Sequence, residues 1–303
     1  MEFRRGNLLY FVTVAEERQV TRAAHKLHLA QPALSHAIAQ LEAEVGVQLF
    51  ERHPRGVTLT PAGEAFLAKA RAALAAEAEA ARTAESLARA NRGTIAVGFI
   101  GPPPALIHGE LFAAYAEEHP ELEVSFQDLP FPRGTTAVWL AGVDVAICHA
   151  PRAEEGVCIH AIRIEPRALV ANNGHPLARR TELGVADVLD ETFVSYHPEV
   201  QPEWAGFHSL DDHRGGPPAN ATDDQALTSL HMLAIMSAGN AVTTVPLTDA
   251  AVAKQVVPGA MVVPLGDADP ARVSLVWRTD TPNPHIATLV ATAERLTASS
   301  SGA

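Results

Sequence analysis

Short polar side chains recur at helical spacing between residues 20 and 42, in a form that could hydrogen-bond to the base edges of duplex DNA. The pattern predicts two short helices. Thr21 can cap the first helix, Ala24 faces inward from it, and Pro32 starts the second helix after a tight connection. The second helix turns an apolar stripe inward and leaves a polar face for a major groove, as helix-turn-helix proteins do. The candidate DNA contacts on the two helices are Thr21, Arg22, Gln31, Pro32, Ser35, His36 and Gln40.

A small β ribbon is predicted directly after these helices, over residues 50–60. Pro54 and Gly56 form its turn. Arg52, Arg55 and Thr58 lie where such a wing would meet phosphates or a minor groove. Phosphate contacts position a protein on DNA, whereas contacts from the recognition helix specify the sequence. For each residue taken singly, an ordinary surface role is the open alternative.

The charge distribution restricts DNA binding to the first third of the chain. The chain carries 23 Lys+Arg against 35 Asp+Glu, a net charge of −12. Residues 1–92 hold 12 of these basic and 10 of these acidic side chains, which leaves 11 and 25 for residues 93–303. The first part is therefore slightly positive and the second strongly negative, so that only the first approaches a polyanion without repulsion.

Composition predicts a soluble protein of the cytoplasm with two or three domains. The 303 residues are too many for one compact core, and the 47% of hydrophobic residues exclude disorder. The two cysteines, Cys148 and Cys158, make no disulfide framework and fit a reducing compartment. We expect no membrane span, because no run of about 18 apolar residues occurs.

One long Ala-rich helix is predicted over residues 61–92, between the helix-turn-helix region of residues 1–60 and a third region, 93–303. Thr60 can cap this helix and Pro61 fits its first turn. Small residues at near-heptad spacing favour pairing with a second copy of the chain, and a solvated spacer helix is the alternative. The seam of that pairing consists of Phe66, Ala70, Ala73, Ala80, Ala84 and Leu87.

Alternating strands and helices in the third region predict an α/β fold with parallel sheets in two lobes. Lobe I would comprise residues 93–165 and 267–303, and lobe II residues 166–266. A cleft between two such lobes is a common place for a small ligand. Strands are expected at 95–99, 122–127, 143–148, 167–171, 193–196, 241–245 and 272–278, and helices at 105–118, 135–140, 225–237, from 247 and at 284–296.

The first 92 residues resemble the N-terminal region of LysR-type transcriptional regulators. The shared motifs are Tyr10-Phe11-Val12, Ala23-Ala24, Gln31-Pro32-Ala33-Leu34-Ser35, Leu41-Glu42, the segment 46–52 and Leu59-Thr60-Pro61-Ala62-Gly63. The resemblance implies a winged helix-turn-helix, a dimerising linker helix and a two-lobed effector domain like that of periplasmic binding proteins. It also implies a homotetramer that binds promoter DNA, responds to a small inducer and affects RNA polymerase. Ala30 stands where the family often has a capping Ser, and His36 where it often has Arg.

Within the family, the third region is most similar to regulators of aromatic catabolism that sense muconate-like diacids. The local match is the segment 196–204, which ends in Pro202-Glu203-Trp204. Trp204 offers an aromatic wall, whereas Glu203 adds negative charge that a diacid would not welcome. Arg133, Thr135 and Thr136 at a predicted helix start form a candidate anion site. The other candidate ligand contacts are Pro102 after the first strand, His149 where a relative carries Arg, Thr222 and Asp223 before a predicted helix, and Thr244 at a strand end. The inducer is expected to be a carboxylate or an aromatic-derived compound, and a structural role is the open alternative for each of these residues.

Other chemistry has weaker support in the sequence. The segment with His208, Asp211, Asp212 and His213 lacks the spacing of a zinc motif, so neither a metal nor another cofactor is predicted. We find no nucleophile elbow, no phosphate-binding glycine loop and no paired catalytic carboxylates, so an enzyme is not predicted. Two alternatives to an inducer remain: a redox switch of Cys148 and Cys158, and a repressor that needs no ligand.

Overall fold

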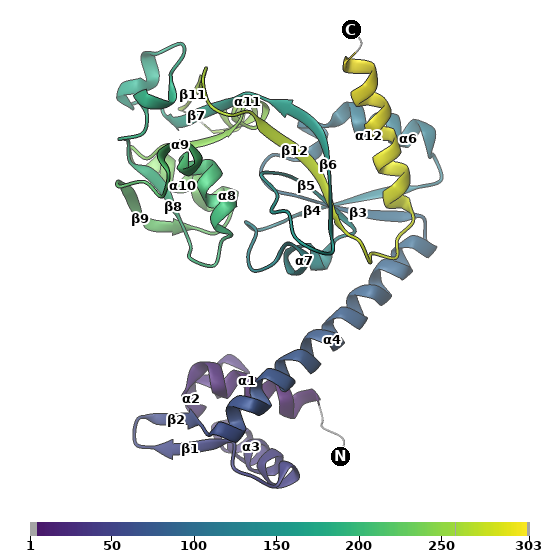
Figure 1. Cartoon of the computed structure of the whole chain (residues 1–303), viewed down its shortest axis with the longest axis vertical. Helices are drawn as coiled ribbons and strands as arrows, with labels where there is room; N and C mark the ends of the chain where they lie inside the picture. Colours follow the sequence, from purple (N-terminus) through teal and green to yellow (C-terminus); the bar gives the residue numbers. More distant parts are fainter. Residues whose placement is uncertain (1–4, 258, 302–303) are drawn as a thin grey trace. The chain divides into compact units, whose positions relative to one another are not determined.

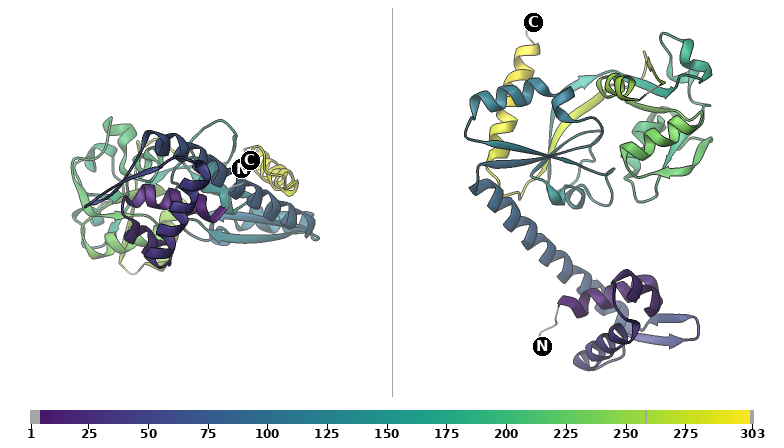
Figure 2. Two further views of the ribbon diagram at one scale, coloured as in Figure 1. Left: turned by 90° about the horizontal axis from the view of Figure 1, so that it is seen from below. Right: turned by 180° about the vertical axis from the view of Figure 1, so that it is seen from behind.

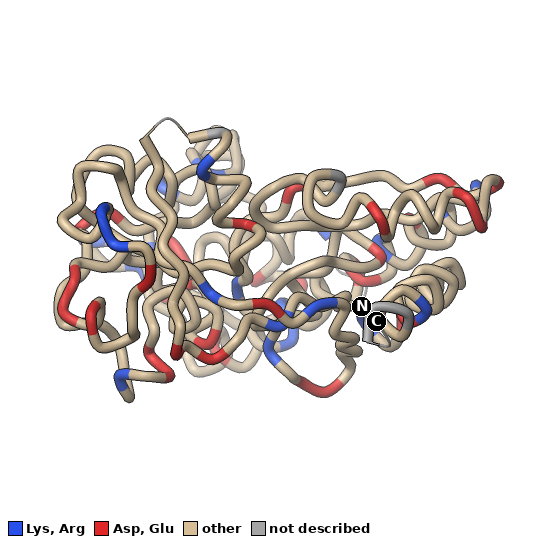
Figure 3. Tube along the Cα trace, turned by 90° about the horizontal axis from the view of Figure 1, so that it is seen from above, with Lys and Arg blue, Asp and Glu red and all other residues tan. Residues whose placement is uncertain are grey.

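The computed structural model describes residues 5–257 and 259–301. The chain forms two compact units, and the boundary between them falls between Arg82 and Thr83, within one long helix. No helix among the described residues is both long and apolar enough to cross a membrane. Asp and Glu residues, coloured red in Figure 3, recur along the trace of the chain.

The first unit is a three-helix bundle with a two-stranded ribbon (Figure 1). Its elements are α1 (Arg5–Glu17), α2 (Val20–Lys26), α3 (Gln31–Val45), β1 (Phe50–His53), β2 (Gly56–Leu59) and the first turns of α4 (Pro61–Asn91). The core collects one apolar stripe from each helix around Phe11, whose ring lies 5.1 Å from the rings of both Phe50 and Phe66. Because each helix buries only one stripe, its other face stays free for polar contacts.

Side-chain hydrogen bonds attach the ribbon and the long helix to this bundle. The Glu42 carboxylate on α3 accepts hydrogen bonds from the backbone N–H groups of Leu49 and Phe50, at 2.8 and 3.0 Å, which fixes the start of β1. The Thr60 hydroxyl accepts from the Gly63 N–H at 3.0 Å, so Thr60 caps α4 as the sequence predicts. The beginning of α4 is thereby held to the rest of the first unit.

Two sequence expectations in the first unit are wrong. Thr21 does not cap α2, because the helix already begins at Val20 and the extended residue before it, Gln19, makes no side-chain cap. Phe66 and Ala70 are not free for a helix pair, because both pack in the core of the first unit. The remaining seam positions, Ala73, Ala80, Ala84 and Leu87, are exposed.

Lobe I of the second unit is built on a five-stranded sheet of order β4-β3-β5-β12-β6. The strands are β3 (Thr94–Phe99), β4 (Glu123–Asp128), β5 (Val145–His149), β6 (Val157–Glu165) and β12 (Ala271–Arg278). The helices are α5 (Pro104–Ile107), α6 (Gly109–Glu118), α7 (Thr136–Trp139), the 3-10 turn η1 (Leu140–Gly142) and α12 (His285–Ser301). One face is covered by α6 and α12, which lie side by side (Figures 1 and 2).

Lobe II contains a three-stranded sheet of order β10-β7-β11 and a two-stranded sheet of β8 and β9. The strands are β7 (Arg167–Asn172), β8 (Phe193–Tyr196), β9 (Ala221–Ala226), β10 (Thr243–Pro246) and β11 (Ala260–Pro264). The helical segments are η2 (Pro176–Arg179), η3 (Val185–Asp187), α8 (Pro202–Ser209), α9 (Asp211–Arg214), α10 (Ser229–Ala238) and α11 (Leu247–Val256). A shared apolar core joins the two lobes, with Phe131 and Trp139 from lobe I beside Trp204 and Met236 from lobe II.

The α/β class is confirmed, but three details of the predicted elements are wrong. The sheets are not purely parallel, since β12 runs antiparallel to both β5 and β6. The strands β6 and β11 were not predicted. Thr222 and Asp223 lie inside the strand β9 and do not precede a helix, because α10 begins later, after its cap at Thr228.

A buried carboxylate ties the end of α4 to lobe I. Asp144 accepts hydrogen bonds from Ser86 Oγ (2.6 Å), Arg89 (2.8 and 2.9 Å), the Ala96 N–H (2.9 Å) and Asn283 Nδ2 (3.0 Å). Burial alone would raise the pKa of Asp144, but the hydrogen bonds from Arg89, Ser86 and Ala96 outweigh it and hold the pKa below its ordinary value. The carboxylate is therefore ionised and fully partnered.

Candidate DNA interface and effector pocket

The helix α3 presents a polar face to solvent while its apolar stripe is buried. Leu34, Ile38 and Leu41 are at most 3% exposed. Gln31, Pro32, His36 and Gln40 are exposed and Ser35 is half-buried. Thr21 and Arg22 are exposed on the neighbouring helix α2. The structure thus brings the seven candidates of these helices together on one small unit, six of them exposed and Ser35 half-buried.

The turn between α2 and α3 fixes the angle of the two helices without a side-chain cap. His28 adopts a left-handed backbone with φ 54°, and the Leu29 N–H donates to the Ala24 carbonyl at 2.9 Å. Ala30 occupies the N-cap position of α3 and has no side chain that could accept a hydrogen bond. The absence of a capping Ser costs the helix start about 1 kcal/mol.

The polar residues of this face are ordered by local hydrogen bonds. Gln31 Nε2 donates to Ser35 Oγ at 2.8 Å, and Gln40 Nε2 donates to Glu44 at 3.1 Å. Arg22 lies 3.2 Å from Glu17. These exposed pairs contribute little to stability, so the side chains can exchange their partners for base edges and phosphates at small cost.

The wing is seated on the connection between α1 and α2. The Val57 N–H donates to the Arg18 carbonyl at 2.9 Å. Gly56 has φ 144°, and a Cβ atom there would lie 2.2 Å from the same carbonyl, so only glycine permits this approach. Arg52, Arg55 and Thr58 are exposed on the ribbon. The guanidinium groups of Arg52 and Arg55 are therefore exposed on a ribbon whose position is fixed by contacts with the rest of the unit.

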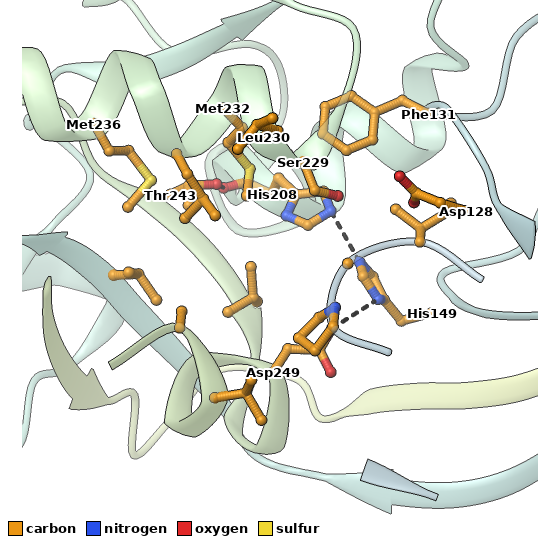
Figure 4. A pocket seen from close by; sticks show the side chains of 18 of the residues that line it. Asp128, Phe131, His149, His208, Ser229, Leu230, Met232, Met236, Thr243 and Asp249 are labelled. Carbon is orange, nitrogen blue, oxygen red and sulfur yellow. Dashed lines mark hydrogen bonds and ion pairs between the residues drawn. The ribbon is translucent and has the colours of Figure 1, made fainter. Parts of the chain in front are cut away.

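A cavity of about 260 Å³ lies between the two lobes of the second unit. Apolar side chains form most of its wall, among them Phe131, Trp204, Met232, Met236 and Val252. Its polar lining residues are Asp128, His149, His208, Ser229, Thr243 and Asp249, several of which point into the cavity in Figure 4. An apolar cavity of about 150 Å³ already holds benzene, so this cavity has room for a substituted ring.

Two histidines close a hydrogen bond across the lobes at the base of this cavity. His149 ends β5 in lobe I, His208 belongs to α8 in lobe II, and their Nε2 atoms are 2.9 Å apart (Figure 4). His208 Nδ1 lies 2.5 Å from the Thr244 carbonyl, so Nδ1 carries the proton of His208 and its Nε2 accepts from His149. Burial lowers the pKa of His149 to about 3 and that of His208 well below its ordinary value. Both rings are therefore neutral.

The carboxyl of Asp249 lies beside this pair, with Oδ2 3.9 Å from His149 Nδ1. Burial, together with the nearby negative charge of Glu165, raises the pKa of Asp249 to about 7. Burial also raises the pKa of Asp128. The cavity therefore contains two carboxyl groups that are harder to ionise than usual, and Asp249 keeps its proton below about pH 7.

The predicted ligand contacts are only partly brought together. Pro102, His149 and Trp204 line the cavity. Pro202 and Glu203 start α8, and Glu203 is exposed and 3.7 Å from Arg152. Thr222 and Asp223 lie on β9 outside the cavity lining. Thr244 is buried behind the wall, where its hydroxyl accepts from Arg167 at 3.0 Å, whereas its neighbour Thr243 faces the cavity.

The predicted anion site at α7 is filled by the chain itself. Thr135 Oγ1 accepts from the Val138 N–H at 3.2 Å, and the Ala137 N–H donates to the Glu154 carboxylate at 3.0 Å. Thr136 is buried and its hydroxyl lies 3.4 Å from both the Arg152 carbonyl and Gln201 Nε2. Arg133 lies 3.4 Å from Glu199. These residues lie outside the lining of the interlobe cavity.

Sequence reasoning missed the residues that give the cavity its character. Asp249 is a first-turn residue of α11 and carries no motif that marks it as a lining residue. His208 was considered only for metal binding. Phe131 and Met236 carry no polar group that would mark them, and they line the cavity because the loop after β4 in lobe I and α10 in lobe II meet there.

The cysteines are held apart by a strand. Cys148 on β5 lies opposite Ser274 of β12, and Cys158 on β6 lies opposite Trp277 of the same strand. Two strand spacings, about 10 Å, therefore separate them, which exceeds the Cα distance of a disulfide. Burial raises the pKa of the Cys148 thiol to about 12, so it is a poor nucleophile.

A cluster of Asp212, His213 and Asp269 is the one group of metal-ligand type found among the described residues. Two of its three side chains, His213 and Asp212, already have partners. His213 Nε2 accepts from the Asp269 N–H at 3.2 Å, and Asp212 lies 3.1 Å from the buried guanidinium of Arg167. We interpret the cluster as a network of hydrogen bonds and ion pairs at the surface.

Comparisons with known proteins cover both units. The bacterial regulatory helix-turn-helix family of lysR type matches residues 6–64, and the LysR substrate binding domain matches residues 88–297. AlsR of Bacillus subtilis is 31% identical over 81% of this chain and 80% of its own. TdfR of Cupriavidus pinatubonensis is 30% identical over 97% of this chain and 98% of its own. Both are HTH-type transcriptional regulators.

Solved structures of similar proteins have the same fold as this chain. The crystal structure of CbnR, a LysR family transcriptional regulator, is 24% identical, covers 97% of this chain and 99% of its own, and superposes with a TM-score of 0.58, which shows the same fold. The structure of full-length CbnR complexed with its target DNA is 26% identical over 97% of this chain and all of its own, with a TM-score of 0.51.

Proposed function

The chain belongs to the LysR family of bacterial transcriptional regulators, and from this premise we propose that α3 reads the sequence of its promoter DNA while the wing binds the backbone. The observation that carries the proposal is the exposed polar face of α3, held at a fixed angle by the buried stripe of Leu34, Ile38 and Leu41. Short amide and hydroxyl side chains on such a face pair with base edges, and the Arg side chains of a wing pair with phosphates.

Two substitutions separate these roles. Gln31→Ala removes a base contact, so the preference for the protein's own promoter over scrambled duplex should fall by roughly 1–3 kcal/mol. Arg55→Ala removes a phosphate contact, so both duplexes should bind more weakly by the same factor, with a salt slope lower by about 1. Affinities are measured by fluorescence anisotropy at several salt concentrations.

Matched variants control for general damage. Gln48→Ala removes an exposed amide that lies outside α3, and Arg71→Ala removes an exposed guanidinium 3.1 Å from Glu16. Neither should change affinity or specificity. Equal losses on promoter and scrambled duplex for Gln31→Ala and Arg55→Ala alike would refute the assignment.

We propose further that a small effector occupies the cavity between the lobes and regulates DNA binding. The size of the cavity, its apolar wall and the His149–His208 hydrogen bond across the lobes support this role, since a ligand there contacts both lobes at once. A ligand that binds one relative placement of the lobes better than another shifts the equilibrium toward that placement.

We also propose that the protein assembles as a dimer through α4, and as a tetramer through pairs of dimers, on DNA that RNA polymerase then reads. The exposed Ala73, Ala80, Ala84 and Leu87 support pairing, because small residues let two helices approach closely. The separation of Cys148 from Cys158 and the raised pKa of Cys148 favour a ligand over a thiol switch as the signal.

A further inference from the structure

We propose that the effector of the interlobe cavity is an uncharged, largely apolar small molecule, and that carboxylates are excluded from it. This inference rests on the proposed role of the cavity and adds the chemical class of its ligand. Three independent features of the second unit carry it: the side chains that line the cavity, the protonation of its polar groups, and the partners of the nearby cations.

The lining offers a carboxylate no positive charge. Among the described residues, no Lys or Arg side chain lines the cavity, whereas Asp128 and Asp249 do. Transfer of an ionised carboxylate from water into such a site costs several kcal/mol unless a cation compensates it. Contact with the apolar wall of Phe131, Trp204 and Met236 instead stabilises a bound uncharged ring or alkyl group.

The polar groups of the cavity suit a neutral ligand. Both histidines are neutral. Their Nε2 atoms hydrogen-bond to each other, and His208 Nδ1 donates to the Thr244 carbonyl. Below its pKa of about 7 the Asp249 carboxyl keeps its proton and can donate it to a carbonyl or hydroxyl oxygen. An ammonium group would require the ionised form of Asp249, which burial and Glu165 oppose.

The cations around the cavity already have internal partners. Arg167, which is buried behind Thr244, lies 3.1 Å from Asp212 and donates to the Phe207 carbonyl. Arg133 lies 3.4 Å from Glu199. Arg152 lies 3.7 Å from Glu203.

The start of α7, where the sequence predicts an anion site, accommodates the carboxylate of Glu154. The chain thus supplies a carboxylate of its own to each of these positive groups. An effector carboxylate would have to displace one of them.

The test uses three molecules of nearly equal shape and different charge: benzamide, benzoate and benzylamine. Their binding to the full chain is measured by titration calorimetry at pH 6.0, below the pKa of Asp249. Benzamide should bind at least tenfold more tightly than benzoate and benzylamine. Asp249→Asn removes the negative charge that this carboxyl carries above its pKa without changing the shape of the cavity, so at pH 8 it should raise the affinity for benzoate at least threefold. Asp224→Asn, at an exposed position on β9, should change nothing.

Two variants that fill the cavity show where the molecules bind. Ala253→Trp and Leu233→Trp add bulk on two different helices of the wall, so that one remains informative if the other does not fold. Both should abolish benzamide binding. If benzoate or benzylamine binds as well as benzamide and these variants abolish that binding, the cavity is the effector site and the proposed class is wrong.

Two other results would overturn different parts of the proposal. If benzamide binding survives both cavity-filling variants, the cavity itself is the wrong site, and the proposed role of the cavity fails together with the ligand class. If none of the three molecules binds, the inference of an uncharged ring-sized ligand is also overturned. The DNA-binding variants of α3 report on the rest of the proposed function independently.

Discussion

Asp249 couples the state of the cavity to pH through a single proton. Its pKa of about 7 in the folded protein lies above the ordinary value of 3.8. Between these values the folded chain keeps a proton that the unfolded chain has released, so the contribution of Asp249 to stability falls as pH rises from about 4 to 7. The groups that face it are His149 on β5 and Glu165 and Arg163 on β6, of which Arg163 lowers the pKa.

The Asp249→Asn variant removes this penalty at high pH. The stability of the variant relative to the parent chain should increase by about 2–3 kcal/mol between pH 5 and pH 8, measured by urea denaturation of the second unit. The titration of His149 and His208 occurs in both chains and cancels in the difference. A difference that is the same at both pH values would show that Asp249 ionises normally.

Single residues show the limits of sequence reasoning most clearly. The polar face of α3 was predictable, because helical spacing separates His36 and Gln40 from the buried Leu34 and Leu41. The cavity residues were not predictable in the same way. Asp249 and His149 are 100 positions apart in the sequence, and nothing local shows that β5 and α11 meet.

At the scale of elements, the connection of α4 to lobe I depends on Asp144. The Asp144 carboxylate accepts hydrogen bonds from three side chains and one backbone N–H group, and it is completely buried. Asp144→Ala leaves Arg89 buried without its partner, so the second unit should lose about 3–5 kcal/mol of stability.

Glu85→Ala is the matched control for this change, because Glu85 is exposed on the same turns of α4. Thermal or urea denaturation gives the comparison. A loss below about 1 kcal/mol for Asp144→Ala would mean that the end of α4 is held mainly by apolar contacts and that the carboxylate network adds little.

Elements were predicted well where the signal is local and poorly where it depends on distant partners. The cap at Thr60 and Pro61 located the start of α4. The strand β6 has no regular alternation of buried and exposed residues, and its partner β12 follows more than 100 positions later. In β9, Thr222 and Asp223 are residue types that favour helix caps, so a polar edge strand was interpreted as the approach to a helix.

At the scale of the whole molecule, assembly through α4 is open to direct measurement. Ala80→Glu places a charge on the exposed seam, so dimers should dissociate and the affinity for a two-site promoter should fall by at least tenfold, while binding to a half-site stays unchanged. Light scattering during size-exclusion chromatography gives the mass.

Ala75→Glu is the control for this variant, because Ala75 is exposed on the opposite side of the helix from the seam. It should leave the mass and the affinity as they are. A dimer that persists in Ala80→Glu would place the subunit contact elsewhere in the chain.

The net charge of −12 makes the molecule as a whole a poor partner for DNA, and residues 93–303 carry all of the excess. Specific contacts from α3 must therefore supply more of the binding energy than general attraction does. This consequence connects the charge distribution to the central claim that a small helix reads a particular promoter.

The most direct test of that claim compares the affinity of the full chain for its own promoter with its affinity for a scrambled duplex of equal length, at low salt, with and without benzamide. We predict a preference of at least about 100-fold for the promoter. Equal affinities for the two duplexes, in the presence and in the absence of benzamide, would contradict the account.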